Sequence, residues 1–252
     1  ALTIQADVTS AAARAAMLDE VAAQFGRLDI LVNNAGTFVE RDFTAGIDAA
    51  GGIDEEIALN LTAPIKLTSE AMERWGDLKA IVFVTSGFAL ISPTRAPTYG
   101  AVKAGLHAFA EGIRGQLEPK GTLILEVLPT LTATPMNARM SGRKMPPSVV
   151  ADITLSALAA GRSRLMREPA KVGRPATLIR FLTAKGIPSS GKGARPAARE
   201  ASSAAALARA RSAVTVVKAF RTGSRSAMRA SAASMEATAL MPGTPARGRL
   251  RR

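Results

Sequence analysis

The stretch Leu28-Asp-Ile-Leu-Val-Asn-Asn-Ala-Gly36 decides the fold of this chain. Its apolar and β-branched residues form a short continuous run, which is typical of a strand covered on both faces in a parallel sheet. Two further runs of this kind follow over 80–85 and 123–128, and residues 2–6 form a fourth strand candidate. The pattern predicts an α/β fold built around a parallel sheet.

Amphipathic segments lie between these apolar runs, as expected for βαβ units. The sequence predicts helices over about 10–25, 53–75, 98–117 and 148–159. Polar or glycine-bearing residues follow each strand candidate, at the positions where open α/β sheets bind ligands. The loop between the last strand and the last helix is where a substrate lid would lie.

The positive charge of the chain is concentrated in its last third. Residues 1–160 hold 13 Lys and Arg and 17 Asp and Glu, whereas residues 161–252 hold 20 and 3, so the net charges are −4 and +17. The second segment is also poor in large apolar residues, a composition that does not offset the entropy of ordering. We therefore expect one domain over 1–160 and a basic, low-complexity tail over 161–252, mostly disordered or locally helical.

The composition also excludes several classes of site. The chain has no cysteine and one histidine, His107, so neither a disulfide framework nor a thiolate or histidine-rich metal site is expected. No run of 18 apolar residues and no signal-peptide pattern occurs, which predicts a protein without a membrane span and with a cytoplasmic location. His107 is expected to be a packing or interface residue.

The clearest chemical signal is Tyr99-Gly-Ala-Val-Lys103, with Ser86 upstream at a strand end. Residues i and i+4 share a helix face, so the phenol and the ammonium stand side by side. A nearby ammonium favours phenolate, which predicts a lowered pKa for Tyr99 and a usable acid or base. Taken alone, the same residues are also compatible with a packing tyrosine and a solvated lysine.

The order and spacing of several motifs together carry more weight. Over residues 2–160 the chain resembles the short-chain dehydrogenase/reductase family, and the stretch 53–110 most resembles the oxidoreductases associated with D-alanylation of teichoic acids. The resemblance implies an NAD(P)-dependent oxidoreductase that transfers hydride between nicotinamide and a carbonyl or secondary alcohol. The motifs that carry it are Leu28–Gly36, Asn60, Ser86, Tyr99 and Lys103.

Four of these residues correspond to the catalytic group of the family. The resemblance implies that Tyr99 gives and takes the proton and that Ser86 orients the substrate oxygen. It further implies that Lys103 lowers the pKa of Tyr99 and holds the nicotinamide ribose, and that Asn60 holds a water of the proton relay.

The resemblance also implies a cofactor, NAD or NADP, and this sequence does not decide between them. Asp7 and Val8 correspond to the adenine contacts, and the lid segment meets the nicotinamide. Thr130 stands where the family usually has glycine, and this places the close approach of backbone to nicotinamide in doubt. Besides Tyr99 and Lys103, the implied cofactor-binding residues are Asp7, Val8, Asn34, Ala35, Gly36, Pro129, Thr132 and Thr134.

One departure from the family is large. No Gly-x-x-x-Gly-x-Gly loop for the pyrophosphate occurs in these 252 residues, and Gly191-Lys-Gly193 follows no predicted strand. Family comparison thus implies an incomplete Rossmann-like, doubly wound parallel sheet, with its first two strands missing and its cofactor binding impaired. We expect residues 2–6 to pair directly beside 28–33, so that the four strands follow chain order.

Other functions stay open at this point. The chain could be a non-catalytic binding protein whose basic tail, including a helix over 204–220, engages nucleic acid or anionic membrane. Without such a role, the tail attracts nucleic acid only non-specifically, and it also has the composition of a GC-rich gene read out of frame.

Arg143 and Lys144 either attract an anionic substrate or belong to a solvated loop. For the enzyme, the expected partners are a small carbonyl or alcohol substrate and a second copy of the chain in a homo-oligomer.

Overall fold

The structure is a computed structural model that describes residues 2–166 and, in its backbone, residues 216–217. Most of the basic tail, including Gly191-Lys-Gly193, lies outside the described residues, and the predictions made for it stay predictions. The exception is Val216–Val217, which forms a short strand where a helix over 204–220 was considered.

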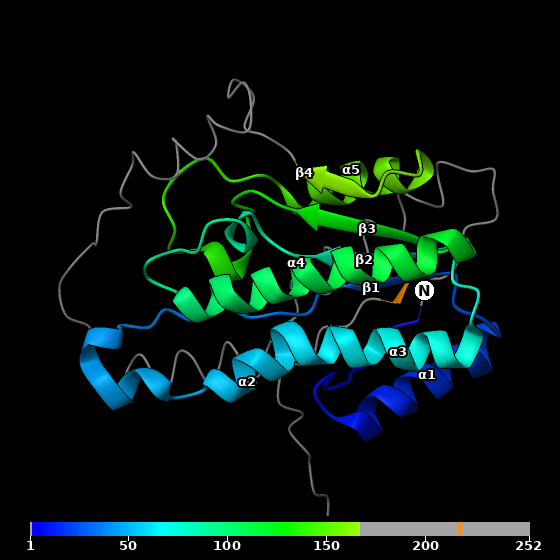
Figure 1. Ribbon diagram of the computed structural model, residues 1–252, viewed down its shortest axis with the longest axis horizontal. Coiled ribbons are helices and arrows are strands. Elements are labelled where there is room, and N and C mark those ends of the chain that lie inside the picture. Colours follow the sequence, from blue (N-terminus) through cyan, green and yellow to red (C-terminus); the bar gives the residue numbers. More distant parts are fainter. Residues whose placement is uncertain (1, 167–215, 218–252) are drawn as a thin grey trace, which may run out of the picture.

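The core of the fold is a five-stranded sheet with the order β4-β3-β2-β1-β5 (Figure 1). Four strands run parallel, with Ile30 opposite Ala80 and Ala80 opposite Leu123. β5 pairs antiparallel with the free edge of β1. The predicted α/β fold and its parallel sheet are confirmed. The strands are β1 (Ile30–Asn33), β2 (Ala80–Val84), β3 (Leu123–Leu128), β4 (Arg164–Met166) and β5 (Val216–Val217).

Five α-helices and several shorter turns connect the strands in the described part of the chain. The helices are α1 (Ala11–Phe25), α2 (Ile53–Ile57), α3 (Ala63–Trp75), α4 (Pro97–Leu117) and α5 (Pro147–Ala159). The 3₁₀ turns are η1 (Phe43–Ala50), η3 (Gly87–Ala89), η4 (Glu118–Lys120) and η5 (Pro135–Asn137). No helix of the described residues has both the length and the apolar character needed to cross a membrane.

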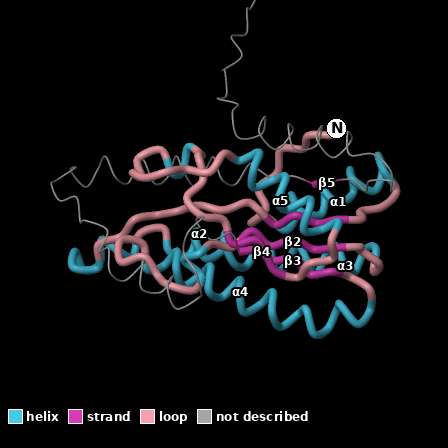
Figure 2. The backbone as a smooth tube through the Cα atoms, turned by 90° about the horizontal axis from the view of Figure 1, so that it is seen from above, coloured by secondary structure: helices cyan, strands magenta, loops and turns pink. Residues whose placement is uncertain are grey.

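The sheet is covered on both faces, as its apolar strands predict. Leu31, Ile81 and Ile124 face a core built with α1, α3 and α4. Val32, Val82 and Leu125 alternate with them and face α5 and Leu165. Figure 2 shows α4 and α5 on opposite sides of the strands. This layering brings the carboxyl ends of β1, β2 and β3 together at one edge, beside the beginning of α4.

The prediction of a strand over residues 2–6 is wrong. These residues have no ladder partner, although Ala6 is buried and Ile4 packs against the core. The prediction that they pair beside β1 is therefore also wrong, and β5 occupies that edge. Of the apolar residues at alternate positions, Ala6 is buried, Ile4 is half-buried and Leu2 is exposed. The alternation therefore reflects contact with the core at one end of the segment and not strand pairing.

The sheet also extends beyond residue 160. β4 pairs in parallel with β3, with Glu126 opposite Arg164 and Leu128 opposite Met166. Sequence analysis missed this strand because the composition of the whole segment 161–252 outweighed three residues at its beginning. The division into a domain and a tail stays a prediction, but the described sheet includes these three residues.

The predicted helix over 53–75 is continuous but not regular. A π-helical turn, Ala58–Thr62, lies between α2 and α3 and contains Asn60. One turn of this kind inserts an extra residue and displaces the side chains that follow, and such insertions are frequent at functional sites. The turn leaves Leu59 and Asn60 both buried.

Candidate active site

The residues singled out in the sequence gather where β1, β2 and β3 end. Ser86 follows β2 and caps η3, accepting a hydrogen bond of 3.1 Å from the Phe88 N–H. Tyr99 and Lys103 lie on the first two turns of α4, which begins at Pro97. Proline suits the first position of a helix because it lacks the N–H that would be unpaired there. Tyr99 lies two residues after this start, and its phenol faces Ser86 at the end of β2.

Tyr99 is held in a largely apolar setting. Its side chain is 8% exposed and its ring meets Phe38 edge-on at 5.0 Å and Phe88 at 6.4 Å between centroids. The Lys103 Nζ lies 5.7 Å from the centroid of the Tyr99 ring. The predicted neighbourhood of the phenol, the ammonium and Ser86 is present.

The predicted electrostatic effect of Lys103 on Tyr99 is wrong for the chain alone. Burial raises the pKa of Tyr99 to about 12, a hydrogen bond with Ser86 opposes this rise, and the charge of Glu56 adds to it. Burial also lowers the pKa of Lys103 to about 8, because the interior disfavours the charged ammonium. The ammonium is directed at a backbone carbonyl, donating to Val84 O at 3.0 Å. The spacing of Tyr99 and Lys103 in the sequence predicted that they are neighbours, but not that both are removed from water.

Asn60 fixes the loop that follows β1. Its amide donates to the Thr37 carbonyl at 3.0 Å and accepts from the Thr37 N–H at 3.1 Å. A Cβ added to Gly36 would lie 2.6 Å from Asn60 Oδ1 and 3.6 Å from Lys103 Nζ. Glycine is therefore required at 36 for close approach, and Gly36, Asn60 and Lys103 converge on one point.

A pocket lies beside this loop, at the end of β1. Three of the implied cofactor-binding residues, Val8, Asn34 and Ala35, contribute to its lining. Asp7 has a local role, because its carboxylate accepts from both the N–H and the hydroxyl of Thr9, at 2.9 and 2.7 Å. The full lining is Val8, Val32, Asn33, Asn34, Ala35, Leu59, Ala63, Pro64 and Leu67.

The lid segment after β3 is tied mainly to itself. The Thr132 hydroxyl donates to the Thr130 carbonyl at 2.8 Å, and the Thr134 N–H donates to the Thr132 carbonyl at 2.9 Å. Thr132 also forms an isolated bridge with Met145. Pro129 and Thr134 are half-buried. Lys144 donates to the Ala138 carbonyl at 3.0 Å and is part of this exposed loop.

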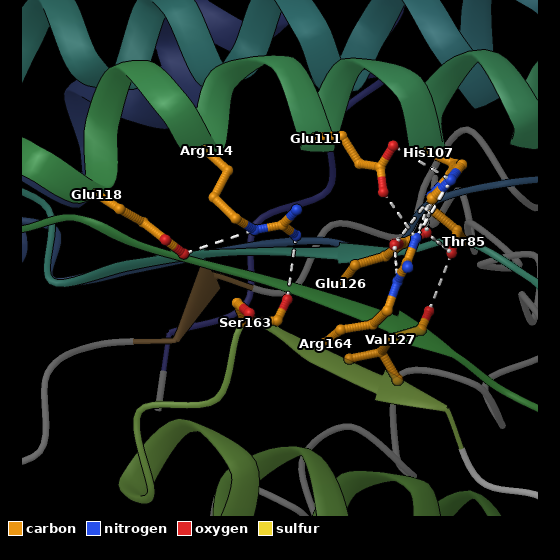
Figure 3. Close-up of polar contacts among 9 residues, drawn as sticks. All are labelled: Thr85, His107, Glu111, Arg114, Glu118, Glu126, Val127, Ser163 and Arg164. Carbon is orange, nitrogen blue, oxygen red and sulfur yellow. Dashed lines mark hydrogen bonds and ion pairs between the residues drawn. The ribbon is translucent and has the colours of Figure 1, made fainter.

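His107 belongs to a polar cluster that its sequence context did not indicate. Its Nδ1 lies 3.0 Å from both oxygens of Glu126, which is fully buried on β3 (Figure 3). Thr85 donates to Glu126 at 2.7 Å, and Arg164 of β4 donates to it at 3.2 Å. The cluster thus anchors Thr85, the residue before Ser86, to β3 and β4.

Sequence analysis also missed a buried ion pair near Tyr99. Glu56 belongs to the acidic first turn of α2, together with Asp54 and Glu55. Its side chain is nevertheless fully buried and contacts Arg41, which is 8% exposed. Asp54, Glu55 and Glu56 are adjacent in the sequence, and nothing in the sequence indicates that Glu56 is the buried one.

Comparison with known proteins identifies the family. A family model described as short chain dehydrogenase matches residues 1–144. This chain belongs to that family. The resemblance drawn from the motifs is thereby confirmed, together with the Rossmann-like character of the fold.

Relatives and solved structures agree with this assignment. The uncharacterized oxidoreductase DltE of Bacillus subtilis is 35% identical over 141 residues, covering 54% of this chain and 55% of that protein. A short-chain dehydrogenase from Burkholderia cenocepacia, solved with NADP, is 30% identical with a TM-score of 0.54, covering 62% of this chain and 68% of that one. A short-chain dehydrogenase from Sphingobium yanoikuyae, solved with NADPH, is 26% identical with a TM-score of 0.58, covering 75% of both chains.

The match is partial in length. The chain spans about half the length of the curated relatives that it matches.

Proposed function

We propose that this short-chain dehydrogenase reduces a small carbonyl compound, or oxidises the corresponding alcohol, with NADP(H) or NAD(H) as the hydride carrier. The observation that carries the proposal is the convergence of Ser86, Tyr99 and Lys103 at the end of β2, with Asn60 against Gly36 behind them. This is a setting in which a phenol can deliver a proton to an oxygen. Two relatives of known structure bind NADP or NADPH.

The residues of the chain have separate tasks in this reaction. The Ser86 hydroxyl binds the substrate oxygen, and the Tyr99 phenol gives it a proton during reduction. With a pKa raised to about 12, the phenol is fully protonated at neutral pH and is ready to act as a donor. Lys103 replaces the proton lost from Tyr99, and a pKa near 8 makes proton release from its ammonium easy.

The cofactor would supply the hydride when bound, and the chain offers a partial set of contacts for it. Val8, Asn34 and Ala35 line the pocket at the end of β1, on the side where the resemblance places the adenosine group. Pro129, Thr132 and Thr134 belong to the segment after β3, where family members meet the nicotinamide, while Asp7 would contact the adenine. The 252 residues contain no glycine-rich pyrophosphate loop, so we expect this chain by itself to bind dinucleotide weakly.

Deuterium transfer tests the proposal directly. The chain is prepared as it stands and also preceded by a glycine-rich strand–loop–helix segment from a relative. Each form is incubated with nicotinamide-deuterated NADPH or NADH and a panel of aldehydes and ketones. The extended form should place deuterium on the carbinol carbon of a product. Absence of transfer from either cofactor, in an extended form that binds the cofactor, would contradict the proposal.

A further inference from the structure

A buried ion pair lies beside the beginning of α4, outside the group of residues used above. Glu56 is fully buried, and Arg41, from the loop after β1, is nearly so. Arg41 Nη1 contacts Glu56 Oε2, and its Nη2 donates to the Gly51 carbonyl at 3.0 Å. The pair therefore connects the loop after β1 to the residues that lead into α2.

Thr98 extends this connection to Tyr99. Its hydroxyl donates to Glu56 Oε2 at 2.7 Å and accepts from Arg41 Nη1 at 3.1 Å. Thr98 lies in the first turn of α4, where backbone N–H groups lack intrahelical partners and helices fray. A side chain anchored there on two buried charges fixes the entry of the helix, and Tyr99 is the next residue.

A backbone tie supports the same junction from the other side. The Arg41 N–H donates to the Arg95 carbonyl at 2.9 Å, just before α4. The Arg95 guanidinium lies over the Phe38 ring at 5.6 Å, and Phe38 meets Tyr99 edge-on. The loop after β1 therefore contacts Tyr99 by packing and holds its helix by hydrogen bonds.

The charge of Glu56 also reaches the phenol. Burial is the main cause of the raised pKa of Tyr99, and the Glu56 carboxylate adds to it through space. The other groups that face the phenol are the Ser86 hydroxyl, Lys103 and the rings of Phe38 and Phe88. A carboxylate at this place favours the protonated phenol over phenolate.

We propose that Glu56 and Arg41 are positioning residues for Tyr99, which act through Thr98 and hold the phenol in place as a proton donor. The catalytic meaning of this inference rests on the proposed function. The positioning itself is a property of the chain without cofactor or substrate, and it can be measured there.

The alternative is that the pair only stabilises the fold. The chain offers a control, because Arg14 and Glu70 form a second ion pair, between α1 and α3, at 2.7 Å. Its arginine is as buried as Arg41, while the Glu70 side chain is 32% exposed. The Arg14 side chain is 2% exposed, and none of its hydrogen bonds reaches α4. Glu70→Gln thus removes an acidic partner from a buried arginine that has no hydrogen bond to the helix of the phenol.

Tyr99 is the only tyrosine of the chain, so a tyrosine carrying ¹³C at Cζ gives one resonance that reports on it alone. The resonance is followed with pH in the wild type, Glu56→Gln and Glu70→Gln, while circular dichroism checks that each protein stays folded. In Glu56→Gln the titration of the phenol should move to lower pH, because a negative charge that raises the pKa of Tyr99 is gone. In Glu70→Gln it should stay at the wild-type value. Equal titrations in all three proteins would overturn the proposal.

Thr98 provides a second test at neutral pH, where folding is easiest to preserve. Thr98→Val keeps the shape of the side chain but removes its hydroxyl, and it should shift the Cζ resonance. Thr98→Ser keeps the hydroxyl and should restore the wild-type position. Identical spectra for the wild type and Thr98→Val would overturn the proposal even if Glu56→Gln does not fold. Failure of the extended chain to reduce any carbonyl would count against the proposed function and leave these resonances unaffected.

Discussion

The Lys103 ammonium donates its hydrogen bond to the Val84 carbonyl, at 3.0 Å, and not to the phenol one helical turn before it. Val84 is the last residue of β2, and Ser86 lies two residues beyond it. The bond therefore ties α4 to the strand end that carries Ser86. It is made by an amine that is 4% exposed, and burial lowers the pKa of that amine to about 8.

Protein stability should consequently rise between about pH 7 and pH 10. The unfolded chain binds the Lys103 proton up to its ordinary pKa, whereas the folded chain releases it near pH 8, so alkaline conditions favour folding. The free energy of unfolding should increase by about 2 kcal/mol over this range, because the pKa of Lys103 lies at its ordinary value in the unfolded chain and at about 8 in the folded chain. Urea unfolding at several pH values measures it. In Lys103→Met the increase should disappear, and an unchanged increase would exclude Lys103 as its source.

Tyr99 acts in the opposite direction at higher pH. Its folded pKa of about 12 exceeds the ordinary value, so the folded state keeps a proton that the unfolded state loses. The stability that this provides is present below about pH 10 and is lost as the pH rises towards 12. Tyr99→Phe should therefore show a smaller loss of stability above about pH 10 than the wild type. The same loss in both proteins would show that Tyr99 does not contribute.

Gly36 should be the least replaceable residue of the loop after β1. In Gly36→Ala the new Cβ would stand 2.6 Å from Asn60 Oδ1, and Asn60 cannot withdraw without losing its two bonds to Thr37. The free energy of unfolding should fall by about 1–3 kcal/mol. Gly112→Ala is the control, because its Cβ would meet nothing within 4 Å on the exposed face of α4. That variant should gain up to about 1 kcal/mol. Equal changes in the free energy of unfolding for Gly36→Ala and Gly112→Ala would contradict the close packing of Gly36 against Asn60.

Thr85→Val should show the weight of the polar cluster under Ser86. Valine keeps the shape of the side chain but leaves the buried Glu126 carboxylate without a hydrogen bond of 2.7 Å. Thermal or urea unfolding should report a loss of about 1–3 kcal/mol. Ser156→Ala, which removes an exposed hydroxyl bonded to its own helix, should change stability by less than about 0.5 kcal/mol. If Thr85→Val lost no more stability than Ser156→Ala, the Glu126 carboxylate would not need the hydrogen bond from Thr85.

The sequence correctly predicted the strands that lie next to other apolar, buried strands in the sheet. β1, β2 and β3 form the centre of the sheet, where a continuous apolar run has few alternatives to a strand. Residues 2–6 carry a weaker version of the same signal, but pairing depends on a free edge that the sequence cannot locate. β4 was missed for a related reason. Its three residues lie beside a long basic segment, and they form a strand only because the edge of β3 is available for pairing.

The candidate site was predictable where chemistry is tied to spacing. Tyr99 and Lys103 share a helix face because of their separation, and Ser86 follows an apolar run. The contributions of Glu56 and Arg41 depend on which members of charged stretches are buried, and that is decided by tertiary packing. The pKa of Tyr99 was predicted in the wrong direction for the same reason, since desolvation outweighs a charge whose position is set by Val84.

Turnover by a Tyr99→Phe variant tests the central claim most directly. The substitution removes one oxygen, keeps the ring between Phe38 and Phe88, and leaves no other tyrosine in the chain to replace the phenol. In the chain extended by a glycine-rich cofactor segment, kcat for carbonyl reduction should fall at least about 100-fold, with little change in cofactor affinity. A variant that turns over at the wild-type rate with the same affinity would contradict the assignment of Tyr99 as the proton donor.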